Sequence, residues 1–276
     1  MSTAIAVYHG TFGRVTLYHL DKPMIKHVHR EGHLCFWIAG ATATTIVDEV
    51  PCRLSCETAA AINPWQIHNY MPDDRKAGQH LLVLYIRESW FEGCSGSSVG
   101  SLRFGRSDIA INSRIATLVA RVVAQLTGDG RADYLDGHLF DLTSESFVQS
   151  RLLSPPADDR KRTPGVVDFR VRKSIRHMTD NVGDLLDLGN VARSSGISRP
   201  HFFKMFRDQT GVTPKLYWNT LRMERALANL AETPKSITDI GLELGFSSQS
   251  SFSRFFALNT GLSPTDYRRA AHVLHA

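Results

Sequence analysis

The chain has 276 residues, of which 42% are hydrophobic and 21% are charged. This length suits two domains of ordinary size, and the apolar content excludes a disordered chain. The longest apolar run, residues 81–86, is too short to span a bilayer. The N-terminus carries no basic, apolar leader, and four cysteines do not make a disulfide framework. These features predict a cytoplasmic protein that does not associate with a membrane.

The net charge of +5 is divided unevenly along the chain. Residues 1–159 carry 14 basic and 17 acidic side chains, which gives 14 − 17 = −3. Residues 160–276 carry the other 18 basic and 10 acidic side chains, which gives 18 − 10 = +8. A basic half joined to a slightly acidic half predicts that one domain faces a polyanion.

The first hundred residues alternate apolar and polar positions in short runs separated by Gly, Pro and Asn. This texture predicts a β-sandwich or β-barrel. His27 and His29 alternate on one strand face, and His33 and His68 could converge with them. Imidazoles gathered in this way suit a pocket for a small organic effector, a Zn, Fe or Ni site, or simple packing. We expect the effector pocket and no bound metal.

From residue 107 to residue 153 the apolar period becomes helical. Ile111, Ile115, Leu118, Val122 and Leu126 recur at intervals of three and four. These helices either cap the preceding sheet or form the seam of a homodimer, and the sequence favours neither arrangement.

Two adjacent prolines, several charges and a Pro-Gly pair make residues 154–165 a linker. We therefore expect an N-terminal domain at residues 1–153 and a C-terminal domain at residues 166–276.

The C-terminal half contains an internal repeat with an offset of fifty residues. The matching pairs are Ser198/Ser248, Phe202/Phe252, Lys204/Arg254, Phe206/Phe256, Thr210/Thr260, Gly211/Gly261, Pro214/Pro264 and Tyr217/Tyr267. Each copy reads as a helix, a tight turn at Gly196 or Gly245, and a second helix that a serine caps. A further helix over residues 215–230 would join the copies. The region is therefore predicted to be all-α with two helix-turn-helix motifs.

The second helix of each motif presents a polar or basic face without acidic residues. Such side chains reach phosphates and base edges of duplex DNA. The candidates on the first helix are Arg199, Pro200, His201, Phe203, Lys204 and Arg207, and those on the second are Gln249, Ser250, Ser253 and Arg254.

Residues 237–256 and 261–268 resemble the DNA-binding domain of AraC-type (AraC/XylS) transcriptional regulators. The resemblance implies a regulator that binds double-stranded DNA and activates transcription by contacting RNA polymerase. It places base contacts at Pro200, Phe203, Lys204, Gln249, Ser250, Ser253 and Arg254. Arg199, Arg207, Lys215 and Arg222 are then expected to contact phosphates. Where the family more often has Ala, this chain has Gly241.

The spacing Pro23-x-x-x-His27-x-His29, followed by Asn63-Pro64-x-x-x-His68, resembles the cupin-like domain that such regulators carry. The resemblance implies an N-terminal cupin-like β-barrel with flanking helices and a two-domain α+β protein. Its effector pocket would be lined by His27, His29, Trp37, Trp65 and His68. If a metal did bind, the ligands would come from His27, His29, His33 and His68.

No catalytic constellation stands out, so neither enzymatic activity nor a cofactor is expected. Two alternatives remain. One is a metal-binding cupin enzyme or sensor fused to a DNA-binding domain. The other is a ligand-independent DNA-binding protein whose N-terminal domain serves only for dimerisation.

Overall fold

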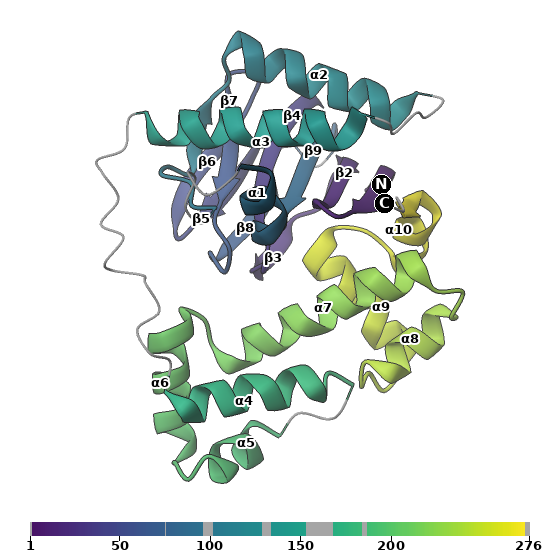
Figure 1. Cartoon of the computed structure of the whole chain (residues 1–276). Coiled ribbons are helices and arrows are strands. Elements are labelled where there is room, and N and C mark those ends of the chain that lie inside the picture. Colours follow the sequence, from purple (N-terminus) through teal and green to yellow (C-terminus); the bar gives the residue numbers. More distant parts are fainter. Residues whose placement is uncertain are drawn as a thin grey trace. The chain divides into compact units, whose positions relative to one another are not determined.

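The computed structural model describes residues 2–74, 76–95, 102–128, 134–152, 168–183 and 187–273. The chain divides into two compact units (Figure 1). One contains Met1–Ala157 together with Phe256–Ala276, and the other contains Asp158–Phe255. The expected linker, residues 154–165, lies outside the described residues.

The unit that contains the N-terminus is rich in strands, which form two sheets. One sheet has the order β10-β7-β4-β9-β2-β1-β11, and the other has the order β3-β8-β5-β6. The expected barrel is therefore not closed, because the strands remain in two separate ladders. The strands are β1 (Thr3–Gly10), β2 (Gly13–Leu20), β3 (Met24–His27), β4 (Gly32–Gly40), β5 (Ala43–Val47), β6 (Val50–Leu54), β7 (Thr58–Ile62), β8 (His68–Pro72), β9 (Gln79–Ile86), β10 (Asp108–Ala110) and β11 (Ala271–Val273).

Strand β9 lies at the centre of the larger sheet and is buried on both of its faces. It pairs antiparallel with β2 along one edge and with β4 along the other. Successive side chains on a strand point to opposite faces. Leu82, Leu84 and Ile86 accordingly enter the hydrophobic core, whereas Leu81, Val83 and Tyr85 line a pocket on the other face.

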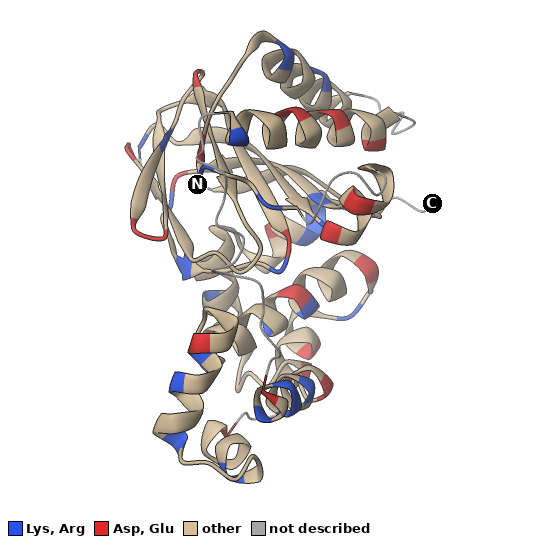
Figure 2. Cartoon of the chain, turned by 60° about the vertical axis from the view of Figure 1, so that its left-hand side comes forward, with Lys and Arg blue, Asp and Glu red and all other residues tan. Residues whose placement is uncertain are grey.

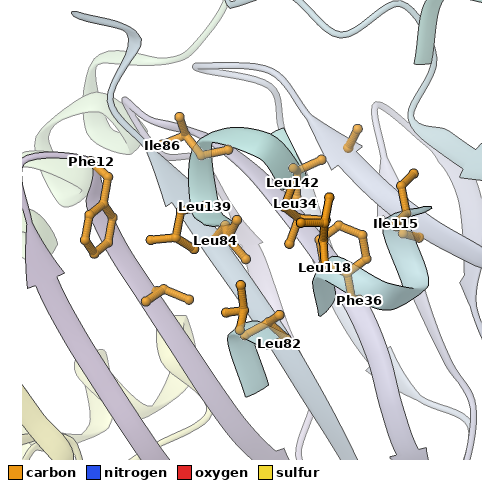
Figure 3. Close-up of a cluster of buried hydrophobic side chains, with 14 of the residues drawn as sticks. Phe12, Leu34, Phe36, Leu82, Leu84, Ile86, Ile115, Leu118, Leu139 and Leu142 are labelled. Carbon is orange, nitrogen blue, oxygen red and sulfur yellow. The ribbon is translucent and has the colours of Figure 1, made fainter. Parts of the chain in front are cut away.

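The hydrophobic core lies between the larger sheet and two helices, α2 (Ser113–Thr127) and α3 (Leu135–Arg151) (Figure 3). Ile115, Leu118 and Leu142 pack there against side chains from the strands. Helix α2 begins at Asn112, whose side-chain oxygen accepts a hydrogen bond from the backbone N–H of Ile115 at 2.8 Å. The apolar stripes of both helices thus pack on the sheet, while the homodimer seam stays a prediction. The shorter helix α1 (Glu88–Ser95) adds Phe91 to the same core.

The rest of the described chain is helical. Among the described residues, no helix combines the length and the apolar content needed to cross a bilayer. The C-terminal helices are α4 (Phe169–Asp180), α5 (Leu188–Ser194), α6 (Arg199–Thr210), α7 (Pro214–Glu232), α8 (Ile237–Glu243), α9 (Gln249–Thr260) and α10 (Pro264–Ala270).

The sequence repeat is also a structural repeat. Helices α5 and α6 form the first helix-turn-helix and α8 and α9 form the second, with Gly196 and Gly245 in the left-handed conformation at the two turns. The ring of Phe206 packs edge-on against Tyr217 with centroids 5.5 Å apart. At the equivalent positions, the rings of Phe256 and Tyr267 meet at 5.6 Å. Helix α7 joins the two motifs, as the amphipathic pattern of residues 215–230 predicts.

Gly241 lies in α8 where that helix contacts α9. A Cβ atom at this position would lie 2.9 Å from the Cβ of Phe252, which is closer than packed atoms tolerate. The atom that would have to move is next to the α9 backbone, so the neighbouring helix itself must shift. The glycine is therefore fitted to this particular packing, in contrast to the alanine that is commoner in the family.

We expect Gly241→Ala to lower the free energy of unfolding by about 1 kcal/mol. Overpacking costs about 1–3 kcal/mol, and a gain of about 1 kcal/mol in helix propensity offsets part of it. Urea denaturation followed by circular dichroism measures the change. The matched control is Gly137→Ala in α3, where a Cβ meets nothing within 4 Å. The control is expected to gain stability, and an equal gain in Gly241→Ala would contradict the packing argument.

Candidate DNA-binding surface and ligand pocket

Helix α6 presents a basic face to solvent. Arg199, His201, Lys204 and Arg207 are exposed, and Phe203 is half-buried. The Arg199 guanidinium lies 5.5 Å from the centre of the Phe203 ring, and Lys204 forms an ion pair with Asp208 at 3.0 Å. Pro200, which cannot donate a hydrogen bond, is exposed in the first turn. This helix is thus better equipped to contact phosphates than to read base edges.

Helix α9 presents hydroxyl, amide and guanidinium groups. Gln249, Ser250 and Arg254 are exposed and Ser253 is half-buried. The Oε1 atom of Gln249 accepts a hydrogen bond of 2.8 Å from the hydroxyl of Thr238 in α8. Because Oε1 is the acceptor in that bond, the side-chain NH₂ of Gln249 keeps its role as a donor. In sum, the α9 side chains carry donors suited to the major-groove edge of guanine and adenine.

Basic side chains recur along the helices of the unit that contains Asp158–Phe255 (Figure 2). The face of α9 remains free of acidic residues, as the sequence predicts.

Arg222 on α7 is expected to contact a DNA phosphate, but its guanidinium is occupied by contacts within the protein. Its guanidinium lies 3.6 Å from the centre of the Phe246 ring, and its Nε donates a hydrogen bond of 2.8 Å to the carbonyl of Leu244. Burial lowers the pKa of this guanidinium to about 10. The side chain thus holds the second helix-turn-helix against α7, where the sequence suggested a phosphate contact.

A pocket lies inside the N-terminal unit, on the face of β9 that points away from α2 and α3. Its volume is about 30 Å³, which is enough for one or a few water-sized groups. The lining side chains come from both sheets: Tyr18, Leu20, Met24, His27, His29, His33, Cys35, Thr45, His68, Asn69, Tyr70, Leu81, Val83 and Tyr85.

All four histidines singled out in the sequence meet in this pocket. His27 and His68 are directly opposite each other in the β3–β8 pair, and their ring centres are 4.3 Å apart. The His29 ring lies 4.9 Å from that of His27. His33, from β4, lies 4.5 Å from His68.

Burial lowers the pKa of each of these four imidazoles. For His29, His33 and His68 the pKa is held well below its usual value, first by loss of solvent and then by the neighbouring histidines. For His27 burial is again the main cause. All four rings are therefore neutral at neutral pH and can offer nitrogen lone pairs.

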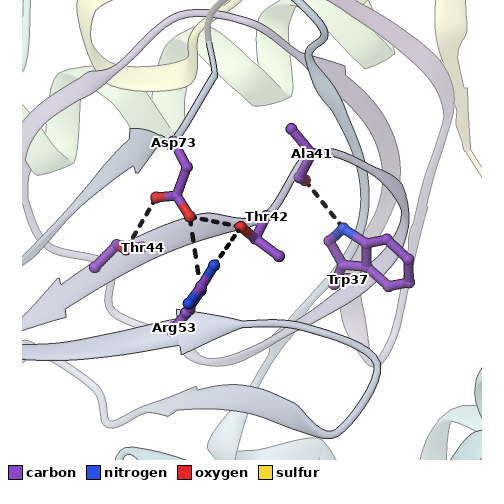
Figure 4. Close-up of polar contacts among 6 residues, drawn as sticks. All are labelled: Trp37, Ala41, Thr42, Thr44, Arg53 and Asp73. Carbon is purple, nitrogen blue, oxygen red and sulfur yellow. Dashed lines mark hydrogen bonds and ion pairs between the residues drawn. The ribbon is translucent and has the colours of Figure 1, made fainter.

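The two expected tryptophans lie elsewhere. Neither Trp37 nor Trp65 is among the residues that line the pocket. The indole N–H of Trp37 donates to the carbonyl of Ala41 at 3.0 Å (Figure 4). The neighbouring Asp73 accepts hydrogen bonds from Thr42 and Thr44 at 2.6 and 3.2 Å. Trp37 thus lies in the second half of β4, and its indole binds the backbone just beyond the end of that strand.

Tyr85 is a pocket residue that sequence reasoning missed. Its ring contacts those of His29 and His33, and the guanidinium of the buried Arg14 lies 3.8 Å from its centre. In the sequence, residues 81–86 read as one apolar run. Every second residue of that run, however, belongs to one face of the strand, and that set ends at Tyr85. That period of two was the signal that could have placed Tyr85 on the pocket face.

Two helix-turn-helix motifs, whose second helices expose basic and polar side chains, define a DNA-binding protein. The helix-turn-helix domain family matches residues 191–270. The arabinose operon regulatory protein of Escherichia coli is 25% identical over 209 residues, which cover 74% of this chain and 69% of the relative. The probable transcriptional regulator LumQ of Photobacterium leiognathi is 23% identical over 249 residues, 90% of this chain and 94% of that protein.

The fold also has solved counterparts. Unsaturated fatty acid bound ToxT from Vibrio cholerae superposes with a TM-score of 0.58 and 15% identity, covering 93% of this chain and 95% of ToxT. At that identity the likeness is one of fold. The sequence matches, together with the two helix-turn-helix motifs, identify the chain as a DNA-binding transcriptional regulator that is similar to regulators of the AraC type.

Proposed function

We propose that this regulator reads promoter DNA with α6 and α9 and adjusts its activity to a small ligand in the histidine-lined pocket. The observation that carries the first part is the pair of equivalent helix-turn-helix motifs. The second helix of each motif exposes basic or polar side chains; α9 has no acidic residue, and in α6 the acidic Asp208 is paired with Lys204. The AraC-type resemblance extends the proposal to activation through RNA polymerase and to action in the cytoplasm.

The ligand part is supported by the pocket and by the two-sheet arrangement, in which we infer a cupin-like domain. ToxT, whose fold is similar, has been solved with an unsaturated fatty acid bound. The pocket described here has only about 30 Å³ of space, whereas sites for drug-sized ligands have about 300–1,000 Å³. We therefore propose a ligand of few atoms. Such a ligand shifts DNA affinity only if it binds the DNA-competent state and the other state with different affinities.

DNA binding by the full-length protein is expected to weaken steeply with salt. Five exposed basic side chains lie on or beside the two second helices, namely Arg199, Lys204, Arg207, Lys215 and Arg254. With about −0.9 per neutralised phosphate, they predict a slope of about −4 to −5 in a plot of log K against log salt. Band-shift titrations on the DNA upstream of the gene, at salt concentrations from about 50 to about 200 mM, measure this slope. A flat plot, or equal affinity for scrambled duplex, would overturn the DNA-reading proposal.

A further inference from the structure

Several nitrogens of the histidine cluster have no hydrogen-bond partner among the described residues. Nε2 of His29, Nδ1 of His33 and Nε2 of His68 are buried without a hydrogen bond within the described part of the chain. An unsatisfied buried polar atom costs about 1–3 kcal/mol. Three such atoms facing one small cavity therefore point to something that the cavity binds.

The orientation of two of these rings is set by the backbone. Nδ1 of His27 lies 2.7 Å from the carbonyl oxygen of Ile25, and Nδ1 of His68 lies 2.8 Å from that of Gln66. A carbonyl oxygen only accepts, so each Nδ1 carries the hydrogen and each Nε2 carries a lone pair. Histidine ligands of metal ions characteristically donate their second N–H to a carbonyl or carboxylate in this manner.

We propose that His27, His29 and His68 bind one divalent transition-metal ion, with His33 beside them as a fourth imidazole. One nitrogen from each of the three rings lies within 4.8 Å of the others. When ligand nitrogens lie about 2.0–2.1 Å from a tetrahedral ion, they are closer to one another than 4.8 Å. A modest rotation of the three rings would therefore complete the site. The cavity has room for an ion and a water molecule.

The donor set selects the class of ion. No carboxylate lines the cavity, which disfavours Ca²⁺ and Mg²⁺. The Cys35 thiol also lines the cavity, and imidazole and sulfur ligands are both typical of transition-metal ions. Neutral imidazoles suit Zn²⁺, Co²⁺, Ni²⁺ and Cu²⁺.

The regulatory meaning of such a site rests on the proposed function, whereas the binding of the ion does not. Strands β3 and β8 pair at Met24–Tyr70 and at His27–His68, with a register shift between these two pairs. An ion bound to His27 and His68 would connect the two strands more firmly. It would thereby order one wall of the pocket.

The test uses full-length protein without an affinity tag, treated with a chelator and dialysed. Zn²⁺ is titrated by calorimetry, and Co²⁺ is followed by its visible absorption. We expect one saturable Zn²⁺ per chain and the intense Co²⁺ bands of a four-coordinate site. His68→Gln should weaken Zn²⁺ binding at least about tenfold, since outer partners of metal ligands alone are worth about 10–100-fold.

The control is His80→Gln. His80 faces His19 across the β2–β9 pair with ring centres 5.0 Å apart, and neither residue lines the pocket. Zn²⁺ affinity should be unchanged in this variant. If His68→Gln fails to fold by circular dichroism, His29→Gln replaces it, because His29 is only half-buried.

Absence of saturable binding overturns the proposal, as does equal Zn²⁺ affinity in the folded His68→Gln or His29→Gln variant. Loss of binding in His80→Gln also overturns it, because the ion would then bind at the His19–His80 pair. DNA affinity measured on the same samples separates the two proposals. Zn²⁺ binding without any DNA binding contradicts the proposed function and leaves the metal site supported.

Discussion

Phe252→Ala is expected to lower the free energy of unfolding of the C-terminal helices by about 3–5 kcal/mol, the range for a buried phenylalanine that leaves a cavity. The Phe252 side chain is fully buried, and its ring packs against that of Phe246. Relaxation around the cavity is limited, since α8 already meets α9 at Gly241 with no spare space. Thermal and urea denaturation by circular dichroism measure the loss.

The repeat supplies a matched variant. Phe202 is the equivalent residue of the first motif and is also fully buried, so Phe202→Ala should cost a similar amount. Leu258→Ala, on the exposed side of α9, should change stability by no more than about 0.5 kcal/mol. A Phe252→Ala protein as stable as the Leu258→Ala protein would show that α9 is not anchored by this ring.

Arg254→Ala should have the opposite profile, with stability unchanged and DNA binding impaired. Arg254 is two residues from Phe252 but is exposed on α9. A guanidinium that contacts a guanine is worth about 1–3 kcal/mol of discrimination, so affinity for the preferred site should fall about 5- to 150-fold. Competition among single-base variants of that site should show relaxed preference at the contacted position.

The control for lost charge is Lys235→Ala. Lys235 is paired with Glu243 at 2.7 Å and lies in the segment just before α8, so it is not part of α9. Its removal should weaken binding to all sequences alike or not at all. Undiminished affinity and unchanged base preference in Arg254→Ala would contradict the assignment of α9 as a base-reading helix.

The helical half of the fold could be predicted from sequence because its signals are local. The predicted first helix of the first motif, 188–194, coincides with α5, and the connecting helix at 215–230 lies within α7. Glycines at 196 and 245 mark turns that need positive φ. The inward phenylalanines follow from i, i+4 spacing, which is a property of single helices.

Predictions for the N-terminal half were less complete because strand pairing is not local. The histidines on β3, on β4 and on β8 were candidates for one site, and their convergence depends on a register that no short motif specifies. The resemblance to a cupin-like domain predicts Trp37 in the pocket. The register of β4 is irregular after Trp37, and the indole binds Ala41 there. The closed barrel was an expectation from the resemblance, and the strands form two open ladders.

The Arg222 clamp has a consequence for the geometry of the operator. Tyr217 contacts α6, and five residues later Arg222 contacts the segment between α8 and α9, so one connector helix fixes both reading helices. A flexible linker would let each motif bind its half-site independently. A rigid helix instead fixes the orientation of the two half-sites around the DNA axis. An inserted base pair turns the half-sites by about one tenth of a turn relative to each other. We therefore expect this protein to recognise operators of a single half-site spacing. Loss of the Arg222 contacts should make it more tolerant of inserted base pairs.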